Sequence, residues 1–383
     1  MISLRSPSTG LQLRPDGPDT IGDGRERWPV LDGIPYLRTG RDDLVRESVA
    51  ALDAGDRTRA LKLLLSDADD WWDGPAPAEP DLDRLLAERD RLSLREAMGL
   101  LAFGRVGDYF AHRWTDPTFL AGLALIDAHW AEPAAAFELA CGIGHYLREL
   151  EAAGVRPIGA DVVFAKLWLA RHWVVGHDVD LVCFDAGSAW PVADFGADLC
   201  VCHDAFYFLE PKAEILRRLR GLLRPGGQLA IGHVHNRGAA NLSAGAGMTA
   251  DEVAAMFPDA AVFDDAELTR AAADGREPVA RPLSELAGVE AFSLVEGAAG
   301  PARTASGPLC APDASRPLRR NPLYRTADRA EAVVAWPSER YADEYGSLAT
   351  YPLRTGLPER PEPGTVSPEQ VRRREAVALP TRW

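Results

Sequence analysis

Two groups of residues in this sequence have the types and spacing that chemistry requires. The first lies in the run Phe137 to Leu150, FELACGIGHYLREL, where Glu138 is followed at fixed spacing by Gly142 and Gly144. An apolar run that ends in Gly-x-Gly and continues as a helix predicts a ligand-binding turn. A dinucleotide site would need a third glycine, but Leu147 stands at that position. The turn therefore favours an adenosyl ligand that carries an amino acid rather than a diphosphate.

The second group consists of histidines at the ends of two later apolar runs. His203 is followed by Asp204, and His233 and His235 alternate, which directs both to one side of a strand. Histidine is the side chain best suited to removing a proton near neutral pH. We predict that His203 or His235 is the general base and that Asp204 orients it. The same four residues also suit divalent iron or zinc, but their spacing is unspecific, so no metal is assigned.

Strands that alternate with helices must position these residues. From residue 134 the pattern predicts strands at 135–141, 156–161, 180–186, 197–204 and 227–236, and helices at 145–154, 164–174 and 211–227. Such alternation indicates an α/β fold, a Rossmann-like doubly wound and mostly parallel sheet. Ligands of these sheets bind beyond the carboxyl ends of the strands, where Asp161, Asp185 and His203 fall.

The segments ELACGIG, GAD, FDA, CHDAFYFL and LLRPGG occur in this order and resemble the motif series of class I S-adenosylmethionine-dependent methyltransferases, over roughly residues 134–236. The resemblance implies S-adenosylmethionine as the cofactor. It places Asp161 at the ribose and Asp185 at the adenine. The full set of cofactor-binding residues that it implies is Glu138, Cys141, Gly142, Gly144, Asp161, Val162, Asp185, Ala186 and His203. Ahead of the glycine turn, Tyr109 and Arg113 are predicted to cap the cofactor, because arginine can pair bidentately with the methionine carboxylate.

Other parts of the chain predict extensions around this domain. Residues 1–40 read as a small β module with a turn at Asp32-Gly33, and they resemble the zinc ribbon that accompanies some RNA and protein methyltransferases. Ser6 and Ser8 stand near the first pair of metal-binding cysteines, so no structural zinc is expected. We predict a helical substrate or dimer region at 41–130, the cofactor domain at 131–300 and an extension at 301–383 whose tail, from Pro358, is poorly ordered.

Composition narrows the function further. The net charge of −15 disfavours nucleic acid as a partner. The five cysteines have no Cys-x-x-Cys spacing, and neither a signal peptide nor a membrane span is evident, so a cytoplasmic protein is expected. We predict methylation of a small molecule in specialised bacterial metabolism, with O-methylation favoured and a homodimer possible. The alternatives are an RNA methyltransferase and a non-catalytic cofactor-binding regulatory or scaffold subunit.

Overall fold

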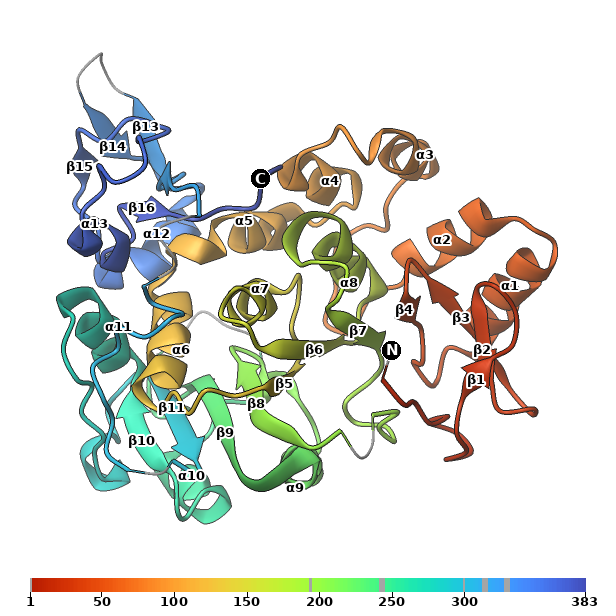
Figure 1. Ribbon diagram of the computed structural model, residues 1–383, viewed down its shortest axis with the longest axis horizontal. Coiled ribbons are helices and arrows are strands. Elements are labelled where there is room, and N and C mark those ends of the chain that lie inside the picture. The colour runs from red at the N-terminus through yellow and green to blue at the C-terminus, as the bar shows by residue number, and fades with distance from the viewer. Residues whose placement is uncertain (1, 193–194, 241–244, 299, 312–315, 327–330) are drawn as a thin grey trace.

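A seven-stranded sheet forms the centre of the molecule, which is described from a computed structural model (Figure 1). The structure describes residues 2–192, 195–240, 245–298, 300–311, 316–326 and 331–383. The strand order is β10-β11-β9-β8-β5-β6-β7. The bounds are β5 Ala135–Leu139, β6 Arg156–Asp161, β7 Asp180–Cys183, β8 Ala197–His203, β9 Leu223–His235, β10 Ala261–Asp264 and β11 Ala291–Glu296.

The strands β5 to β9 are parallel, and helices lie on the connections from β5 to β6, from β6 to β7 and from β8 to β9. These strands are buried along almost their whole length, as expected when helices cover both faces. The prediction of a doubly wound, mostly parallel sheet is confirmed. The helices of this part are α7 His145–Ala152, α8 Phe164–Leu169 with a π-helical turn at Ala170–Val174, α9 Lys212–Leu222, α10 Ala250–Met256 and α11 Asp265–Asp274.

The two faces of the sheet carry separate apolar cores. One core joins α6, Pro117–Ala128, with α7, α8 and α11, and the other joins α9 and α10 with the opposite face. The residues of α6 are buried all round because α6 lies between the sheet and α11. This arrangement encloses the carboxyl end of β9 on one side.

The sheet ends in an antiparallel pair that the sequence patterns did not fully predict. The strand β11 pairs antiparallel with both β9 and β10. Where β9 meets β11, Gly232 and His233 together lie opposite Ser293, which makes a bulge. A bulge bends the strand and redirects the side chains in it. His233, which lies in this bulge, has a φ of 52°.

The N-terminal residues form the predicted small β module, an antiparallel four-stranded sheet (Figure 1, red). Its strands are β1 Arg14–Pro15, β2 Thr20–Gly22, β3 Arg27–Leu31 and β4 Ile34–Pro35. The turn at Asp32-Gly33 is confirmed, since both residues have positive φ and Leu31 pairs with Ile34. The Oγ atom of Ser6 accepts the backbone N–H groups of Ser8 and Thr9, so a hydroxyl holds this turn. Next to β4, Tyr36 bridges to Cys183 of β7.

Helices connect this module to the sheet. They are α1 Asp42–Asp53, α2 Arg57–Leu65, α3 Glu79–Glu88, α4 Leu94–Leu100 and α5 Gly104–His112, followed by a 3-10 turn at Arg113–Thr115. Helix is thus formed over most of the predicted range. The apolar spacing from Leu82 to Leu101 predicts one helical stretch there, but the structure divides it between α3 and α4. Ser93 caps α4 in a capping box with Glu96 and starts a new helix there.

The C-terminal part packs against α11, on the same side of the sheet as α6 (Figure 1, blue). It contains β12 Arg319–Arg320, β13 Tyr324–Thr326, β14 Ala332–Val334, α12 Glu339–Tyr345, β15 Arg354–Thr355, α13 Pro368–Arg372 and β16 Ala376–Val377, with a short 3-10 turn at Gly346–Leu348 after α12. Two other short 3-10 turns, Phe206–Phe208 and Leu283–Glu285, lie earlier in the chain. The expected disorder after Pro358 is wrong. Residues 376–380 are buried, and the Trp383 indole donates to the Ala111 carbonyl at 2.7 Å. In the described residues no helix is both long and apolar enough to cross a membrane.

Candidate functional site

The glycine turn lies between β5 and α7 with its backbone in left-handed conformations. Ala140, Gly142 and Gly144 have φ values of 57°, 57° and 84°. A Cβ atom added to Gly142 would lie 3.1 Å from the Phe110 ring, and one added to Gly144 would lie 3.0 Å from Val175. Glycine is therefore required both by the backbone and by the space. The helix α5, which carries Phe110, covers the turn.

Glu138 lies at the end of β5 directly under this turn. Its side chain is buried, and its Oε2 atom has no hydrogen-bond partner. Burial raises the pKa of this carboxyl well above its ordinary value, and the nearby charge of Asp161 adds to the shift. A buried carboxylate oxygen without a partner is costly unless a ligand donates to it. The unpartnered carboxylate oxygen under this turn therefore fits a ligand with a cationic or N–H group.

Asp161 lies at the end of β6, across from the glycine turn. One of its carboxylate oxygens accepts the Gly142 N–H and the other accepts the Val163 N–H, both at 2.9 Å. A carboxylate has about four lone-pair sites, so about two remain for the hydroxyls of a ribose. The Lys166 Nζ atom lies 3.7 Å from Asp161 and 3.4 Å from Asp69, which brings the helical region over this side of the turn. The place that the sequence assigned to the ribose is therefore compatible with that role.

The other predicted cofactor residues lie on the same edge. Asp185 follows β7, is partly exposed and accepts the Gly187 N–H at 2.8 Å. Ala186 is buried beside it, while Cys141 and Val162 flank Gly142 and Asp161. None of these contacts shows a ligand, so their roles remain predictions.

Sequence reasoning missed Gly159, in the middle of β6. A Cβ atom there would lie 2.3 Å from the Leu147 side chain and 2.9 Å from the Cys141 sulfur. Gly159 thus makes room for the bulky residue that replaces the third glycine of a dinucleotide site. A glycine within a strand signals such a close approach, and this signal was present in the sequence.

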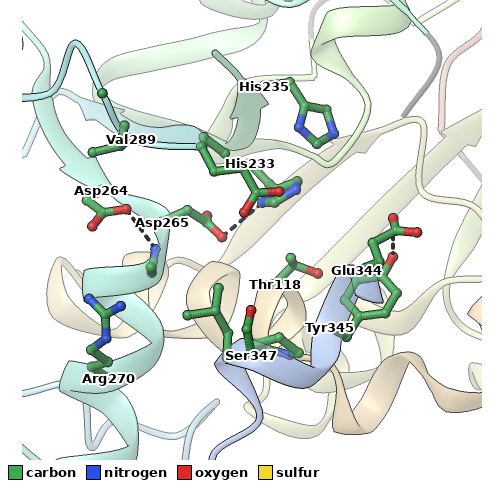
Figure 2. Close-up of a pocket in the computed structure, with 16 residues that line it drawn as sticks. Thr118, His233, His235, Asp264, Asp265, Arg270, Val289, Glu344, Tyr345 and Ser347 are labelled. Atoms are coloured by element: carbon green, nitrogen blue, oxygen red, sulfur yellow. Dashed lines mark hydrogen bonds and ion pairs between the residues drawn. The ribbon is translucent and has the colours of Figure 1, made fainter. Parts of the chain in front are cut away.

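A cavity of about 350 Å³ opens at the end of β9, two strands away from β5 (Figure 2). Its walls come from α6, β9, α11, the residues before β11, and α12. Its charged and histidine residues are His233, His235, Asp264, Asp265, Arg270, Glu290 and Glu344. Sequence reasoning found only the histidines, because the acids come from segments that it did not place beside the sheet.

His233 is held by a chain of hydrogen bonds at the inner end of the cavity. Its Nδ1 atom lies 2.9 Å from the Asp265 carboxylate (Figure 2). This carboxylate also accepts the Ser293 hydroxyl at 2.6 Å. Burial disfavours the charged imidazole, but the Asp265 and Asp204 carboxylates outweigh burial and raise the pKa of His233 to about 9. The neighbouring His235 has an Nδ1 atom that is buried without a partner, and burial beside His233 lowers its pKa to about 4. The prediction that His233 and His235 share one side is confirmed, since their ring centroids are 4.8 Å apart.

Asp204 lies between the two parts of the site, directly after β8. Its carboxylate accepts the hydroxyls of Tyr109 at 2.8 Å and Tyr207 at 2.7 Å. Arg113 lies 3.3 Å from it, and this guanidinium and His233 outweigh burial and lower the pKa of Asp204. Its own φ of 52° is unusual for a residue other than glycine.

His203 does not line the cavity. Its ring stacks on Tyr146 at 4.6 Å, and a Cβ atom on Gly232 would collide with it. Burial lowers the pKa of His203 to about 3. The structure thus brings Asp204 close to His233 and His235 and places His203 behind them, against α7.

Tyr109 and Arg113, which the sequence assigned to the cofactor, are both engaged with Asp204. The Arg113 guanidinium also contacts the Thr118 hydroxyl and lies 3.8 Å from Asp116. Arg113 is almost fully buried, so its charge is balanced within the protein by Asp204 and Asp116. Pairing with the methionine carboxylate stays a prediction for this residue.

Comparisons with known proteins found one matching domain family and several similar solved structures. Residues 137–231 match the model of a methyltransferase-domain family. No curated protein matches the chain. A chain from the complex of the Haloferax volcanii Trm112 methyltransferase activator with a putative methyltransferase is 25% identical, over 36% of this chain and 59% of that chain, with a TM-score of 0.30.

Two further solved structures are similar to parts of this chain. A putative methyltransferase from Bacillus halodurans is 22% identical over 31% of this chain and 52% of its own, with a TM-score of 0.28. A possible histamine N-methyltransferase from Thermotoga maritima is 15% identical over 57% of this chain and 98% of its own, with a TM-score of 0.34. This chain therefore spans between half and three fifths of the length of the first two structures.

The family match and the strand order confirm the Rossmann-like class I methyltransferase fold of the central sheet. The domain is that of an S-adenosylmethionine-dependent methyltransferase, and S-adenosylmethionine is its cofactor. The likeness of the N-terminal module to a zinc ribbon has no such support.

Proposed function

We propose that this protein transfers a methyl group from S-adenosylmethionine to a small molecule bound in the cavity between α6, α11 and α12. The observation that carries the proposal is the position of the two halves of the site on one sheet edge. The glycine turn follows β5, Asp204 follows the adjacent β8, and the histidines of the cavity end the next strand, β9. A cofactor on the glycine turn and an acceptor in the cavity would meet at Asp204.

On one half, the residues of the glycine turn would hold the cofactor. Glu138 would accept from its amino group, and Asp161 from its ribose hydroxyls, because these carboxylates have unfilled acceptor sites. When bound, S-adenosylmethionine supplies a methyl group on a positively charged sulfur. The Phe110 ring of α5, which lies against Gly142, would help to exclude water from the turn. Fixing the reactants in this way provides much of the acceleration expected of a methyl transfer.

On the other half, Asp204 and the two cavity histidines would contact the acceptor nucleophile. An oxygen nucleophile must lose its proton before or during transfer, and His235 offers a neutral imidazole with an unpartnered nitrogen. This geometry favours His235 and Asp204 over His203 as the groups that act on the acceptor. We retain O-methylation as the favoured reaction, and a specialised bacterial metabolite as the acceptor.

The size and charge of the cavity support a small molecule. A volume of about 350 Å³ is at the lower end of the range for metabolite pockets. Four carboxylates against Arg270 would repel a polyanion such as RNA.

The experiment is a methyl-transfer assay with isotopically labelled S-adenosylmethionine and a panel of small alcohols, phenols and amines, read by mass spectrometry. The proposal expects a labelled product with at least one class of acceptor. It also expects His235→Ala to lose most of the rate while binding S-adenosylhomocysteine as the wild type does. Tight cofactor binding without transfer to any class would favour the regulatory or scaffold alternative.

A further inference from the structure

Two histidines that line the cavity, His233 and His235, lie close to Asp204, and these three side chains could share one metal ion. One ligand atom from each of Asp204, His233 and His235 lies within 4.8 Å of the others, in a search over the described part of the chain. Two imidazoles and one carboxylate form the donor set that zinc and ferrous iron accept with positions left open.

We propose that Asp204, His233 and His235 bind one divalent first-row transition metal whose remaining positions face the cavity and take an oxygen of the acceptor. The role of the ion toward the acceptor rests on the proposed function, whereas its binding does not. With the ion present, the two histidines and Asp204 would act on the acceptor through the metal, which polarises the bound oxygen and eases loss of its proton to water.

The surroundings of His233 are those of a metal ligand. Histidines that bind metals commonly donate their second N–H to a carboxylate, which fixes the ring and its tautomer. Asp265 accepts in this way from Nδ1 of His233, and Ser293 fixes Asp265 in turn. The other ring nitrogen, Nε2, is left for a ligand. The bulge in β9 places the backbone of His233 in a left-handed conformation and turns its ring toward Asp204 and His235.

Asp204 retains room for an ion despite its three partners. Its two oxygens offer about four lone-pair sites, of which Tyr109, Tyr207 and Arg113 use three. Carboxylates that bind metals are themselves usually hydrogen-bonded, as Asp204 is by the two tyrosines.

His235 provides the independent observation that a ligand is missing from this place. Its side chain is more than nine-tenths buried, it lines the cavity, and its buried Nδ1 atom has no hydrogen-bond partner. A buried polar atom without a partner costs free energy that a bound ion would recover. The acids Asp264, Glu290 and Glu344 surround the cavity and add a negative field that attracts a cation.

The test is a zinc titration of the full-length protein after treatment with a chelator, followed by calorimetry and by inductively coupled plasma mass spectrometry. The proposal expects one zinc ion per chain, bound with micromolar affinity or tighter. Replacing zinc with Co²⁺ should give visible d–d bands that change with His233→Ala. Each of His233→Ala, His235→Ala and Asp204→Asn should weaken zinc binding by about 100-fold or more, and Asp265→Asn by about 10- to 100-fold.

His129→Ala is the matched control, because His129 is also a buried histidine with an unpartnered nitrogen but lies against Phe263, away from the cluster. It should leave the zinc affinity unchanged. Circular dichroism checks that each variant is folded, and the wild-type titration judges the proposal even if a variant is not.

Absence of saturable zinc binding by the wild type would overturn the proposal, as would equal binding by a folded His233→Ala/His235→Ala double variant. A titration with S-adenosylhomocysteine on the same samples separates this inference from the proposed function. Cofactor binding without metal binding would refute the metal site alone, and metal binding without cofactor binding would refute the proposed function alone.

Discussion

The two halves of the site are built in different ways although they share one sheet edge. The cofactor side, meaning the residues proposed to hold S-adenosylmethionine on β5, β6 and β7, comes from residues 138–186, within one continuous part of the chain. The acceptor side, meaning the cavity at β9, comes from five segments, 117–118, 233–235, 264–270, 288–291 and 344–348. The cofactor side can therefore be recognised from local spacing, whereas the acceptor side exists only once the chain has folded. The comparison suggests that variants on the two sides should affect different measurements.

The largest effect should come from Asp161→Ala on the cofactor side. The variant removes the acceptor of the Gly142 and Val163 N–H groups together with the proposed ribose contact. Because hydrogen bonds to a charged group contribute about 1.5–3 kcal/mol each, the affinity for S-adenosylhomocysteine should fall by about 1000-fold in calorimetry. Zinc binding at the acceptor side should not change. An unaltered cofactor affinity would mean that the ribose is placed wrongly.

On the acceptor side, His235→Ala should lower kcat by about 100-fold or more, the usual contribution of a group that helps move a proton. Its affinity for S-adenosylhomocysteine should stay within about twofold of the wild type, because His235 ends β9, two strands away from the β5 strand that leads into the glycine turn. His203→Ala, which alters a ring stacked on Tyr146, serves as the comparison and should lower kcat less. A parallel loss of cofactor affinity in His235→Ala would contradict the separation of the cofactor side from the acceptor side.

The attachment of the N-terminal module to the cofactor side can be tested with Asp32→Asn. The Asp32 carboxylate accepts from Trp168 at 2.7 Å, pairs with Arg57 at 2.7 Å and lies 2.8 Å from His172. Burial alone would raise the pKa of Asp32, but hydrogen bonds and charge from His172 and Arg57 outweigh it and lower the pKa. The variant should lose about 2 kcal/mol in the free energy of unfolding at pH 7, measured with urea.

The pH dependence of this loss follows from the direction of the shift. Because the folded pKa lies below the unfolded value of about 3.9, the contribution of Asp32 is complete above about pH 4 and is lost as the pH falls through the folded pKa. The difference between wild type and variant should therefore shrink below about pH 4. A difference that grows in acid would contradict the assignment.

The smallest effect concerns the protonation of Glu138. Because burial raises the pKa of this carboxyl well above its ordinary value, the free protein should hold a proton there that the cofactor displaces with its amino group. Binding of S-adenosylhomocysteine should then release up to about one proton, measured by calorimetry in buffers of different ionisation enthalpy, and should tighten as the pH rises. Glu138→Gln should abolish this release and weaken binding by about tenfold. Release that persists in Glu138→Gln would locate the proton elsewhere.

The sequence predicted the cofactor side better than the acceptor side. Strands, helices and the glycine turn were found because their signals are local, such as the alternation in β8 or the Gly-x-Gly spacing. The break between α3 and α4 was missed because the capping box at Ser93 interrupts an apolar pattern that continues across it.

The acceptor side was only partly accessible to sequence reasoning. His233 and His235 were found by type and alternation, but Asp265 and Glu344 were not, because only the packing of α11 and α12 brings them to β9. The ordered C-terminal tail was missed for the same reason. Its short apolar run, 376–379, is buried only in the folded chain, where the Trp383 indole donates to the Ala111 carbonyl.

The most direct test of the account is a crystal structure of the protein with S-adenosylhomocysteine. The account predicts the ligand along the glycine turn, with its amino group on Glu138, its ribose on Asp161 and its sulfur directed toward Asp204 and the cavity. Density for the ligand elsewhere, or a turn that stays empty at saturating ligand while a nicotinamide or flavin dinucleotide binds there, would contradict it.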